Sequence, residues 1–137
     1  MYRQMIDAQN QAPLPNSGDA ICSALRDVTR IIGAVATVTY TSSGHTSLRA
    51  ARERPMAPIL SITPHLATAR RLALAWGVHP TVSAELQDED KIVAAACKSA
   101  LKHGLAKVGD QIAITAGVPF GEPGTTNLLR IAKIWPV

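Results

Sequence analysis

The sequence predicts an α/β domain of three layers, in which helices cover both faces of a five-stranded, mostly parallel sheet whose last strand is antiparallel. Three observations support this fold. Segments with helical spacing of apolar residues alternate with short β-branched runs, which is the pattern of right-handed crossover connections. Aromatic residues make up only 4% of the chain, so the core must consist of Ala, Val, Ile and Leu. The last strand follows a loop instead of a helix, so we expect it to run antiparallel to its neighbour.

Helical spacing that ends at Gly or Pro predicts four helices, at residues 19–32, 47–54, 64–76 and 88–103. Short runs rich in β-branched residues predict five strands, at residues 34–40, 58–62, 78–82, 111–115 and 127–134. In the third helix we expect Thr63 to be the N-cap and Pro64 the first helical residue. The expected apolar face of that helix consists of Leu66, Ala69, Ala73 and Trp76.

We divide the chain into a linker, residues 1–17, and a single domain, residues 18–137. The first residues lack a core pattern, and Ala12–Gly18 is rich in Pro, Asn, Ser and Gly, which favour turns and linkers. A linker at this position predicts that the domain belongs to a longer polypeptide.

The composition is that of a globular domain, and its mild positive charge is compatible with an anionic metabolite as partner. The chain has 137 residues, of which 47% are hydrophobic and 18% charged, and its net charge is +4. This apolar content suffices for a core, and the positive balance suits an anionic metabolite. The basic residues are scattered and no aromatic residues are interleaved with them, so we expect no nucleic-acid partner.

Cysteine usage and hydropathy indicate a cytoplasmic protein. Cys22 and Cys97 lie in helical patterns and form neither a CxxC pair nor a Cys/His pair. We therefore expect neither a disulfide nor a metal site. No run of about 18 apolar residues occurs, so we expect no membrane association.

The loop after the first strand has the composition of a phosphate-binding site. It consists of Thr41, Ser42, Ser43, Gly44, His45 and Thr46. Hydroxyls, backbone N–H groups freed by a glycine and the start of a helix together can hold an oxyanion. An ordinary N-cap is the simpler interpretation, but it needs only one Ser or Thr. Four hydroxyls around one glycine exceed that need.

A second loop, Gly117–Thr126, is too long and too rich in glycine for a minimal strand connection. A mobile flap over a ligand has this composition, and so does a plain surface loop. The residues that would form the flap are Gly121, Glu122, Gly124 and Thr125. Both loops follow strands, and ligands of open α/β sheets bind at the carboxyl ends of strands.

No catalytic or metal-ligating residue is assigned. Ser43 and His45 are close in sequence, but no acidic residue in the loop could orient the imidazole. Asp88, Glu89 and Asp90 could suggest Mg²⁺, yet acidic residues are also favoured in the first turn of a helix, and we prefer that interpretation.

Three segments resemble the C-terminal domain of pyruvate kinase. Residues 39–46 (TYTSSGHT) and 49–55 are similar to the effector-phosphate loop of that family and the helix after it. Residues 57–78 are similar to its central strand–helix–strand unit. Residues 109–110 and 117–131 are similar to its terminal hairpin and effector loop. The resemblance covers residues 18–134 in the family's order and spacing.

The resemblance implies a regulatory domain that is inactive alone. The parent enzyme of glycolysis would transfer phosphate from phosphoenolpyruvate to ADP, giving pyruvate and ATP, in a TIM barrel that this chain lacks. That enzyme would need Mg²⁺ or Mn²⁺ and usually K⁺, whereas this domain itself would hold no cofactor. The domain would bind an allosteric effector and contribute to subunit contacts in a homotetramer.

By position, Thr41, Ser42, Ser43, Gly44 and Thr46 would hold the effector's phosphate, and Gly121–Thr125 would close over its sugar. His45 stands where some relatives have Arg. Relatives that bind a bisphosphate place Trp and Arg near the segment that here is Glu85–Ile92, which is acidic with Lys91 as its only cation. Because these carboxylates would repel a second phosphate, we expect a sugar monophosphate or AMP.

Two alternatives stay open. A free-standing module of this fold could sense a phosphorylated metabolite or bind another protein partner. A structural assembly domain with a decayed effector site would have the same pattern.

Overall fold

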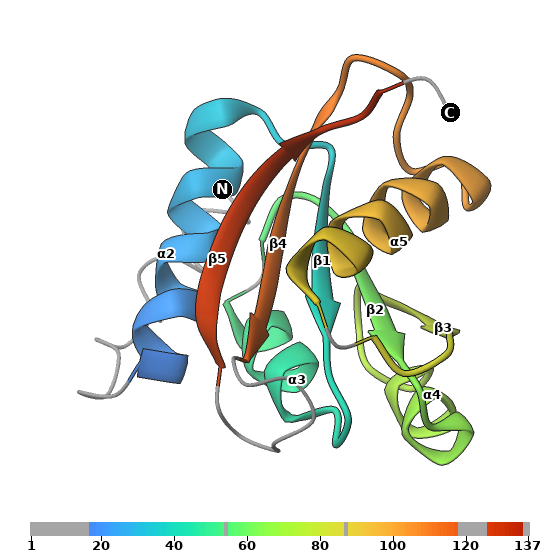
Figure 1. Ribbon diagram of the computed structural model, residues 1–137. Helices are drawn as coiled ribbons and strands as arrows, with labels where there is room; N and C mark the ends of the chain where they lie inside the picture. The colour runs from blue at the N-terminus through green and yellow to red at the C-terminus, as the bar shows by residue number, and fades with distance from the viewer. Residues whose placement is uncertain (1–16, 54, 87, 118–125, 136–137) are drawn as a thin grey trace.

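The described part of the chain is built around one five-stranded sheet (Figure 1). The computed structural model describes residues 17–53, 55–86, 88–117 and 126–135. The strands are β1 (Ala36–Tyr40), β2 (Ile59–Thr63), β3 (Val78–Val82), β4 (Gln111–Gly117) and β5 (Thr126–Lys133). The helices are α2 (Ser17–Ile32), α3 (His45–Arg52), α4 (Leu66–Leu72) and α5 (Glu89–Lys102).

The strands lie in the order β3-β2-β1-β4-β5. β1 pairs in parallel with β2 and β4, and β2 pairs in parallel with β3, whereas β5 is antiparallel to β4. The predicted sheet, mostly parallel with an antiparallel last strand, is therefore confirmed. The connection through residues 118–125 is shorter than the dozen or so residues that a parallel crossover needs, which explains the direction of β5.

Helices cover both faces of the sheet, as predicted. α5 packs on one face against β1, β2, β4 and β5, while α2 and α3 pack on the other. α4 contacts β2 and β3, and its Leu72 shares a core cluster with Leu25 of α2. With right-handed crossovers, the connections from β1 to β3 stay on one face, and the return from β3 to β4 places α5 on the other.

Alternate strand residues supply two different cores. The face under α5 is aliphatic, with Val38, Leu60 and Ile114 at most 1% exposed. The opposite face combines Ile59 and Ala113 with fully buried hydroxyl side chains. These hydroxyl side chains belong to Thr37, Thr39, Ser61, Thr63 and Thr115.

The predicted start of α4 was wrong. Thr63 is the last residue of β2, and Pro64 precedes the helix instead of opening it. The N-cap is His65 in an extended conformation, and its N–H donates to Thr63 Oγ1 over 3.2 Å. The threonine hydroxyl therefore supports the turn before the helix rather than the helix itself.

The predicted end of α4 was also wrong, and of the four residues of its expected apolar face only Ala69 is buried. The N–H of Leu74 bonds to the carbonyl of Arg71, three residues back, so the α-helix stops at Leu72. Trp76 follows the helix and is 60% exposed, and Leu66 and Ala73 are exposed too. The buried residues of α4 are Thr68, Ala69 and Leu72.

Two other helices begin two residues earlier than predicted. α2 begins at Ser17, so the last residue of the expected linker is helical, and residues 1–16 lie outside the described residues. α3 begins at His45 instead of Ser47, because Gly44 completes the turn. Its positive φ of 91° reverses the chain at once and lets the helix start earlier.

Candidate functional site

The strand order creates a switch point between β1 and β4, the place where open α/β sheets bind ligands. These strands are adjacent, with Thr39 opposite Thr115, and the helix that follows β1, α3, packs on the opposite face from the helix that precedes β4, α5. The Thr41–Thr46 loop follows β1 at this edge. Gly117, at the end of β4, pairs with Thr126, so both ends of the second loop lie at the same edge. The flap residues Gly121, Glu122, Gly124 and Thr125 themselves lie outside the described residues.

The Thr41–Thr46 loop is a tight turn held by its own hydroxyls. The N–H of Thr41 continues the ladder with the carbonyl of Ile62 over 3.0 Å. The Oγ1 of Thr41 then accepts the N–H of Gly44 over 2.8 Å. The Oγ of Ser43 accepts the N–H of His45 over 3.3 Å. Two hydroxyls therefore shape the turn from which α3 starts.

Gly44 is the one loop position where a side chain would not fit. Its φ of 91° lies in the left-handed region. A Cβ there would also meet Leu72 Cδ2 and Thr68 Cγ2 at 3.3 Å. α4 therefore packs closely against one side of the turn.

The predicted site residues differ in accessibility. Thr41 and Thr46 are each only 6% exposed. Ser42 is half-buried, and Ser43 and His45 are exposed. The hydroxyls that can meet a ligand are thus those of the two serines, and Thr41 acts on the shape of the turn. Within the described part of the chain, the backbone N–H groups of Ser42 and Ser43 make no hydrogen bond.

Two residues of α4 that sequence reasoning missed contact this loop. Thr68 Oγ1 donates to the carbonyl of Ser42 over 2.9 Å. Arg71 Nη2 donates to the carbonyl of Ser43 over 3.1 Å and lies 3.2 Å from Thr68 Oγ1. The Arg70–Arg71 pair stands out in the sequence, but nothing local indicates that one of them reaches a loop 28 positions away.

A chain of buried hydroxyls fixes α3 on the sheet beside the loop. Ser47 Oγ lies 2.6 Å from Thr39 Oγ1 of β1 and 2.6 Å from Ser61 Oγ of β2. All three side chains are fully buried. Hydrogen bonds are directional, so this chain sets the position of the first turn of α3 relative to both strands.

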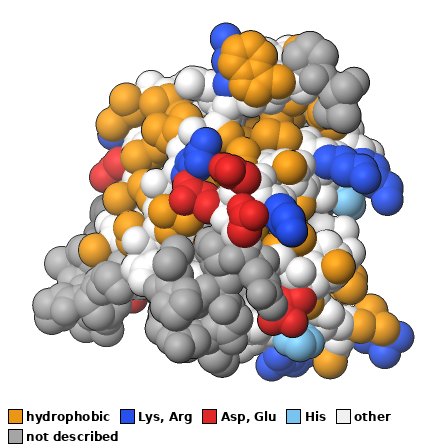
Figure 2. Space-filling model, in the orientation of Figure 1, with side chains coloured by type: hydrophobic (Ala, Val, Ile, Leu, Met, Phe, Trp, Pro, Cys, Tyr) orange, Lys and Arg blue, Asp and Glu red, His pale blue; other side chains and the backbone are white. Residues whose placement is uncertain are grey.

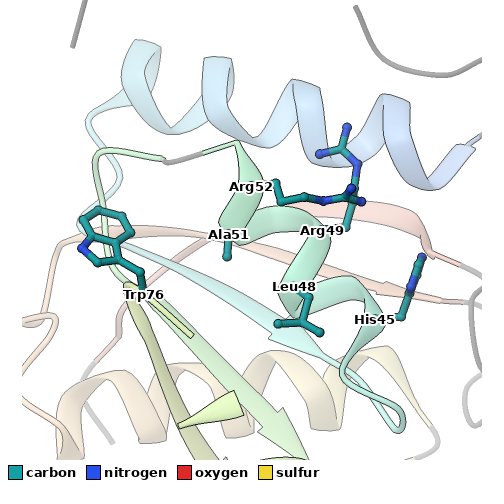
Figure 3. A pocket seen from close by; sticks show the side chains of 6 residues that line it. All are labelled: His45, Leu48, Arg49, Ala51, Arg52 and Trp76. Carbon is teal, nitrogen blue, oxygen red and sulfur yellow. The ribbon is translucent and has the colours of Figure 1, made fainter. Parts of the chain in front are cut away.

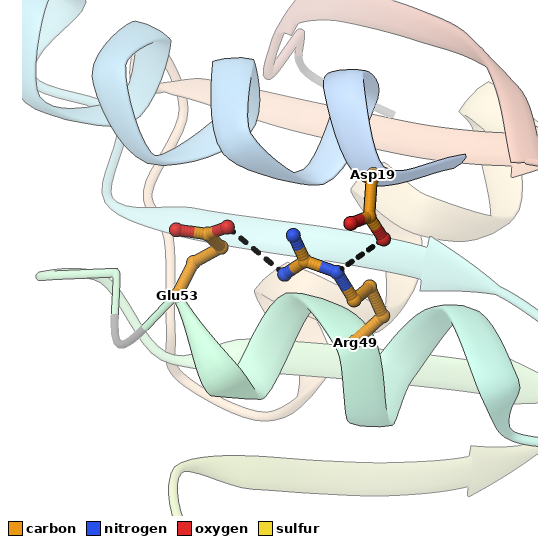
Figure 4. Close-up of polar contacts among 3 residues, drawn as sticks. All are labelled: Asp19, Arg49 and Glu53. Carbon is orange, nitrogen blue, oxygen red and sulfur yellow. Dashed lines mark hydrogen bonds and ion pairs between the residues drawn. The ribbon is translucent and has the colours of Figure 1, made fainter. Parts of the chain in front are cut away.

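An ion cluster joins α2 to α3 (Figure 4). Arg49 Nε lies 2.7 Å from Asp19 Oδ1, and Arg49 Nη1 lies 2.9 Å from Glu53 Oε1. Burial alone would lower the pKa of Arg49, but its hydrogen bonds to Asp19 and Glu53 raise it overall. Burial raises the pKa of the nearby Cys22 thiol from 9.0 to about 11, and the charge of Arg49 opposes that rise.

A hollow of about 510 Å³ runs along the outer side of α3 (Figure 3). It is lined by His45, Leu48, Arg49, Ala51, Arg52 and Trp76. Much of this lining is apolar, and the guanidinium of Arg49 already bonds to two carboxylates. Because Arg49 is engaged, the charged or titratable lining residues left to a ligand in the hollow are Arg52 and His45.

The acidic stretch before and within α5 is largely engaged in contacts. Asp88 Oδ1 accepts the N–H groups of Asp90 and Lys91, so Asp88 is the N-cap of α5, whereas the prediction had placed it in the first turn with Glu89 and Asp90. Glu89 Oε1 lies 2.8 Å from Arg130 Nη1 of β5. Acidic side chains gather in the middle of the face in Figure 2, with basic ones beside them.

The stretch before α5 lies near the end of β1. The N–H of Leu86 donates to the hydroxyl of Tyr40, the residue just before the Thr41–Thr46 loop. The carboxylates at the start of α5 therefore belong to the same edge of the sheet as this loop.

Among the residues that the structure describes, no group of three or more His, Cys, Asp or Glu side chains could hold a metal ion. No helix in the described ranges is both long and apolar enough to span a membrane.

Comparisons with known proteins agree with this architecture. The profile of the family described as "Pyruvate kinase, alpha/beta domain" matches residues 19–132. The chain is 42% identical over 134 residues to a pyruvate kinase of Methylorubrum extorquens, covering 98% of this chain and 28% of that protein. It is 36% identical over 133 residues to a pyruvate kinase of Geobacillus stearothermophilus, covering 97% of this chain and 23% of that protein. The chain thus spans about a quarter of the length of these relatives. It belongs to the pyruvate kinase family and corresponds to that family's C-terminal α/β domain.

Proposed function

We propose that this domain regulates a pyruvate kinase by binding a phosphorylated small-molecule effector at the Thr41–Thr46 loop. The observation that carries the proposal is the pair of unbonded N–H groups at Ser42 and Ser43, in a turn beside the β1–β4 switch point. Unbonded amides and nearby hydroxyls can hold an oxyanion without a full opposite charge. The family membership supports the proposal, because the longer relatives that the chain matches are named pyruvate kinases.

The proposed parent activity is phosphate transfer from phosphoenolpyruvate to ADP, giving pyruvate and ATP. Mg²⁺ or Mn²⁺ and K⁺ would be bound in the part of the relatives that this chain does not span. The assembly would be a cytoplasmic homotetramer, and both cysteines are free, which suits a reducing compartment. β5 is an edge strand of the described sheet and exposes Ile131, so it offers a surface for a second subunit.

We infer that the effector carries one phosphate, as a sugar monophosphate or AMP does. Asp88 and Glu89 lie at the edge of the sheet that carries the loop, because Tyr40 holds the segment before them. Arg130 forms an ion pair with Glu89, so its positive charge is partly neutralised and attracts an anionic ligand less strongly. A second phosphate near these carboxylates would meet net repulsion.

Calorimetric titration tests the proposal. Inorganic phosphate, a sugar monophosphate, AMP and fructose 1,6-bisphosphate are titrated into the chain and into Ser43→Asp. We expect the monophosphates to bind and the new carboxylate to weaken binding by at least about tenfold. Gln111→Glu adds the same charge at the opposite end of β4 and is the control. Silence across the panel would contradict effector binding, and tighter binding of the bisphosphate would contradict the effector class.

A further inference from the structure

The Thr41–Thr46 loop is hydrogen-bonded to α4 through two consecutive backbone carbonyl groups. The carbonyl of Ser42 accepts from Thr68 Oγ1 at 2.9 Å, and the carbonyl of Ser43 accepts from Arg71 Nη2 at 3.1 Å. Thr68 is 4% exposed and is the more rigid of the two donors. Arg71 is exposed, and its guanidinium also contacts Thr68 Oγ1.

These bonds determine which way the amide dipoles of the loop point. A trans peptide group is planar, and its C=O and N–H point in opposite directions. Because the carbonyl of Ser42 points at α4, the N–H of Ser43 points away from α4. Because the carbonyl of Ser43 also points at α4, the N–H of Gly44 points away as well, where Thr41 Oγ1 accepts it.

The alternative orientation would remove the anion site. If the peptide between Ser42 and Ser43 turned over, a carbonyl oxygen would face the ligand, and an oxyanion would be repelled. The close approach of α4 leaves little space for such movement, since a Cβ added at Gly44 would meet Thr68 Cγ2 and Leu72 Cδ2 at 3.3 Å. The donors on α4 thus favour the orientation in which an amide proton faces the open side.

We propose that Thr68 and Arg71 are positioning residues of the phosphate site, and that the N–H of Ser43 binds the phosphate on the side of the loop away from α4. This rests on the proposed function and deepens it. Neither α4 residue needs to touch the ligand. Their effect is to hold the carbonyls of Ser42 and Ser43 away from the anion.

Binding of inorganic phosphate and AMP to four variants tests the proposal. Thr68→Val keeps the shape of the side chain and removes its hydroxyl, whereas Thr68→Ser keeps the hydroxyl. Arg71→Ala removes the second donor, and Arg70→Ala removes the same charge from the neighbouring exposed position of α4. We expect Thr68→Val and Arg71→Ala to weaken binding about tenfold, which is the scale of one hydrogen bond. Thr68→Ser and Arg70→Ala should stay within about twofold of the wild type.

The backbone amide resonance of Ser43 gives a second readout that a purely structural role would not move. Phosphate should shift this resonance in the wild type and in Thr68→Ser, and much less in Thr68→Val. If the wild type binds phosphate and Arg71→Ala behaves like Arg70→Ala with the Ser43 shift intact, the proposal is wrong while the site stands. If the wild type binds none of the probes, the proposed function itself fails. Arg71 is exposed, so its variant keeps the test decisive even where Thr68→Val does not fold.

Discussion

The two faces of the sheet are buried to the same degree but are held in different ways. Under α5 the buried side chains are mostly aliphatic, so the stability of that face depends on how closely these side chains pack. Under α3 the fully buried set includes Thr39, Ser61 and Ser47, joined at 2.6 Å. These directional hydrogen bonds fix the position of α3 on that face. The candidate site lies at the start of the same helix, since the Thr41–Thr46 loop leads directly into α3.

The largest expected effect tests the apolar face. Ile114→Ala should lower the free energy of unfolding by about 2–5 kcal/mol, because it leaves a cavity in a core where Ile114 is 1% exposed. Urea unfolding measures the change. Ile31→Ala, at a position that is 70% exposed, removes the same atoms and should change stability far less. Equal losses at the two positions would contradict the view that volume filling holds this face.

The next effect tests the hydroxyl face. Ser47→Ala removes very little volume but leaves Thr39 and Ser61 without their shared partner, so we expect a loss of about 1–3 kcal/mol. The triple variant Thr39→Val, Ser47→Ala, Ser61→Ala removes all three hydroxyls, so no hydroxyl is left without its hydrogen-bond partner. It should recover part of the lost stability. If the triple variant is less stable than the sum of its single changes, directional bonding is not what distinguishes the faces.

Two glycines separate backbone strain from crowding at the loop. Gly44→Ala and Gly33→Ala both place a Cβ on a residue with positive φ, which costs about 1–2 kcal/mol. Only at Gly44 would that Cβ also meet neighbours at 3.3 Å, while nothing lies within 4 Å at Gly33. Thermal unfolding should therefore show a greater loss for Gly44→Ala, together with weaker phosphate binding. Identical melting temperatures would show that α4 yields to the added methyl.

The smallest effect is a pH dependence at Cys22, on the same face as α3. Its folded pKa of about 11 lies above the ordinary 9.0, so the folded protein holds the thiol proton more tightly. This contribution to stability is complete below pH 9 and is lost as pH rises toward 11, at up to about 1.4 kcal/mol per pH unit. Urea unfolding at pH 8 and pH 10 should show a steeper decline for the wild type than for Cys22→Ala. Parallel declines would mean that the thiol does not titrate differently on folding.

Local pattern was enough for the element order, the antiparallel β5, the acidic first turn of α5 and the turn at Gly44. Each of these depends on residues a few positions apart, so spacing and conformational preference express it directly. The length of α4 could not be predicted from local pattern. Ala73 and Trp76 continue the helical spacing of apolar residues, although the α-helix ends at Leu72. The spacing of apolar residues shows which of them could share one helix face. It does not show where the backbone hydrogen bonds change from four residues apart to three, as they do at Leu74.

The sequence shows the composition of the Thr41–Thr46 loop, but its geometry could not be predicted from the sequence. Four hydroxyls near a glycine indicate an anion site, yet only the packed chain shows that Thr41 is buried and that Thr68 and Arg71 hold the carbonyls. The adjacency of β1 and β4 likewise comes from strand order, which pairs segments more than 70 positions apart. Contacts of that range arise from the hand of the crossovers and from three-dimensional packing, and a linear pattern carries no direct signal for them.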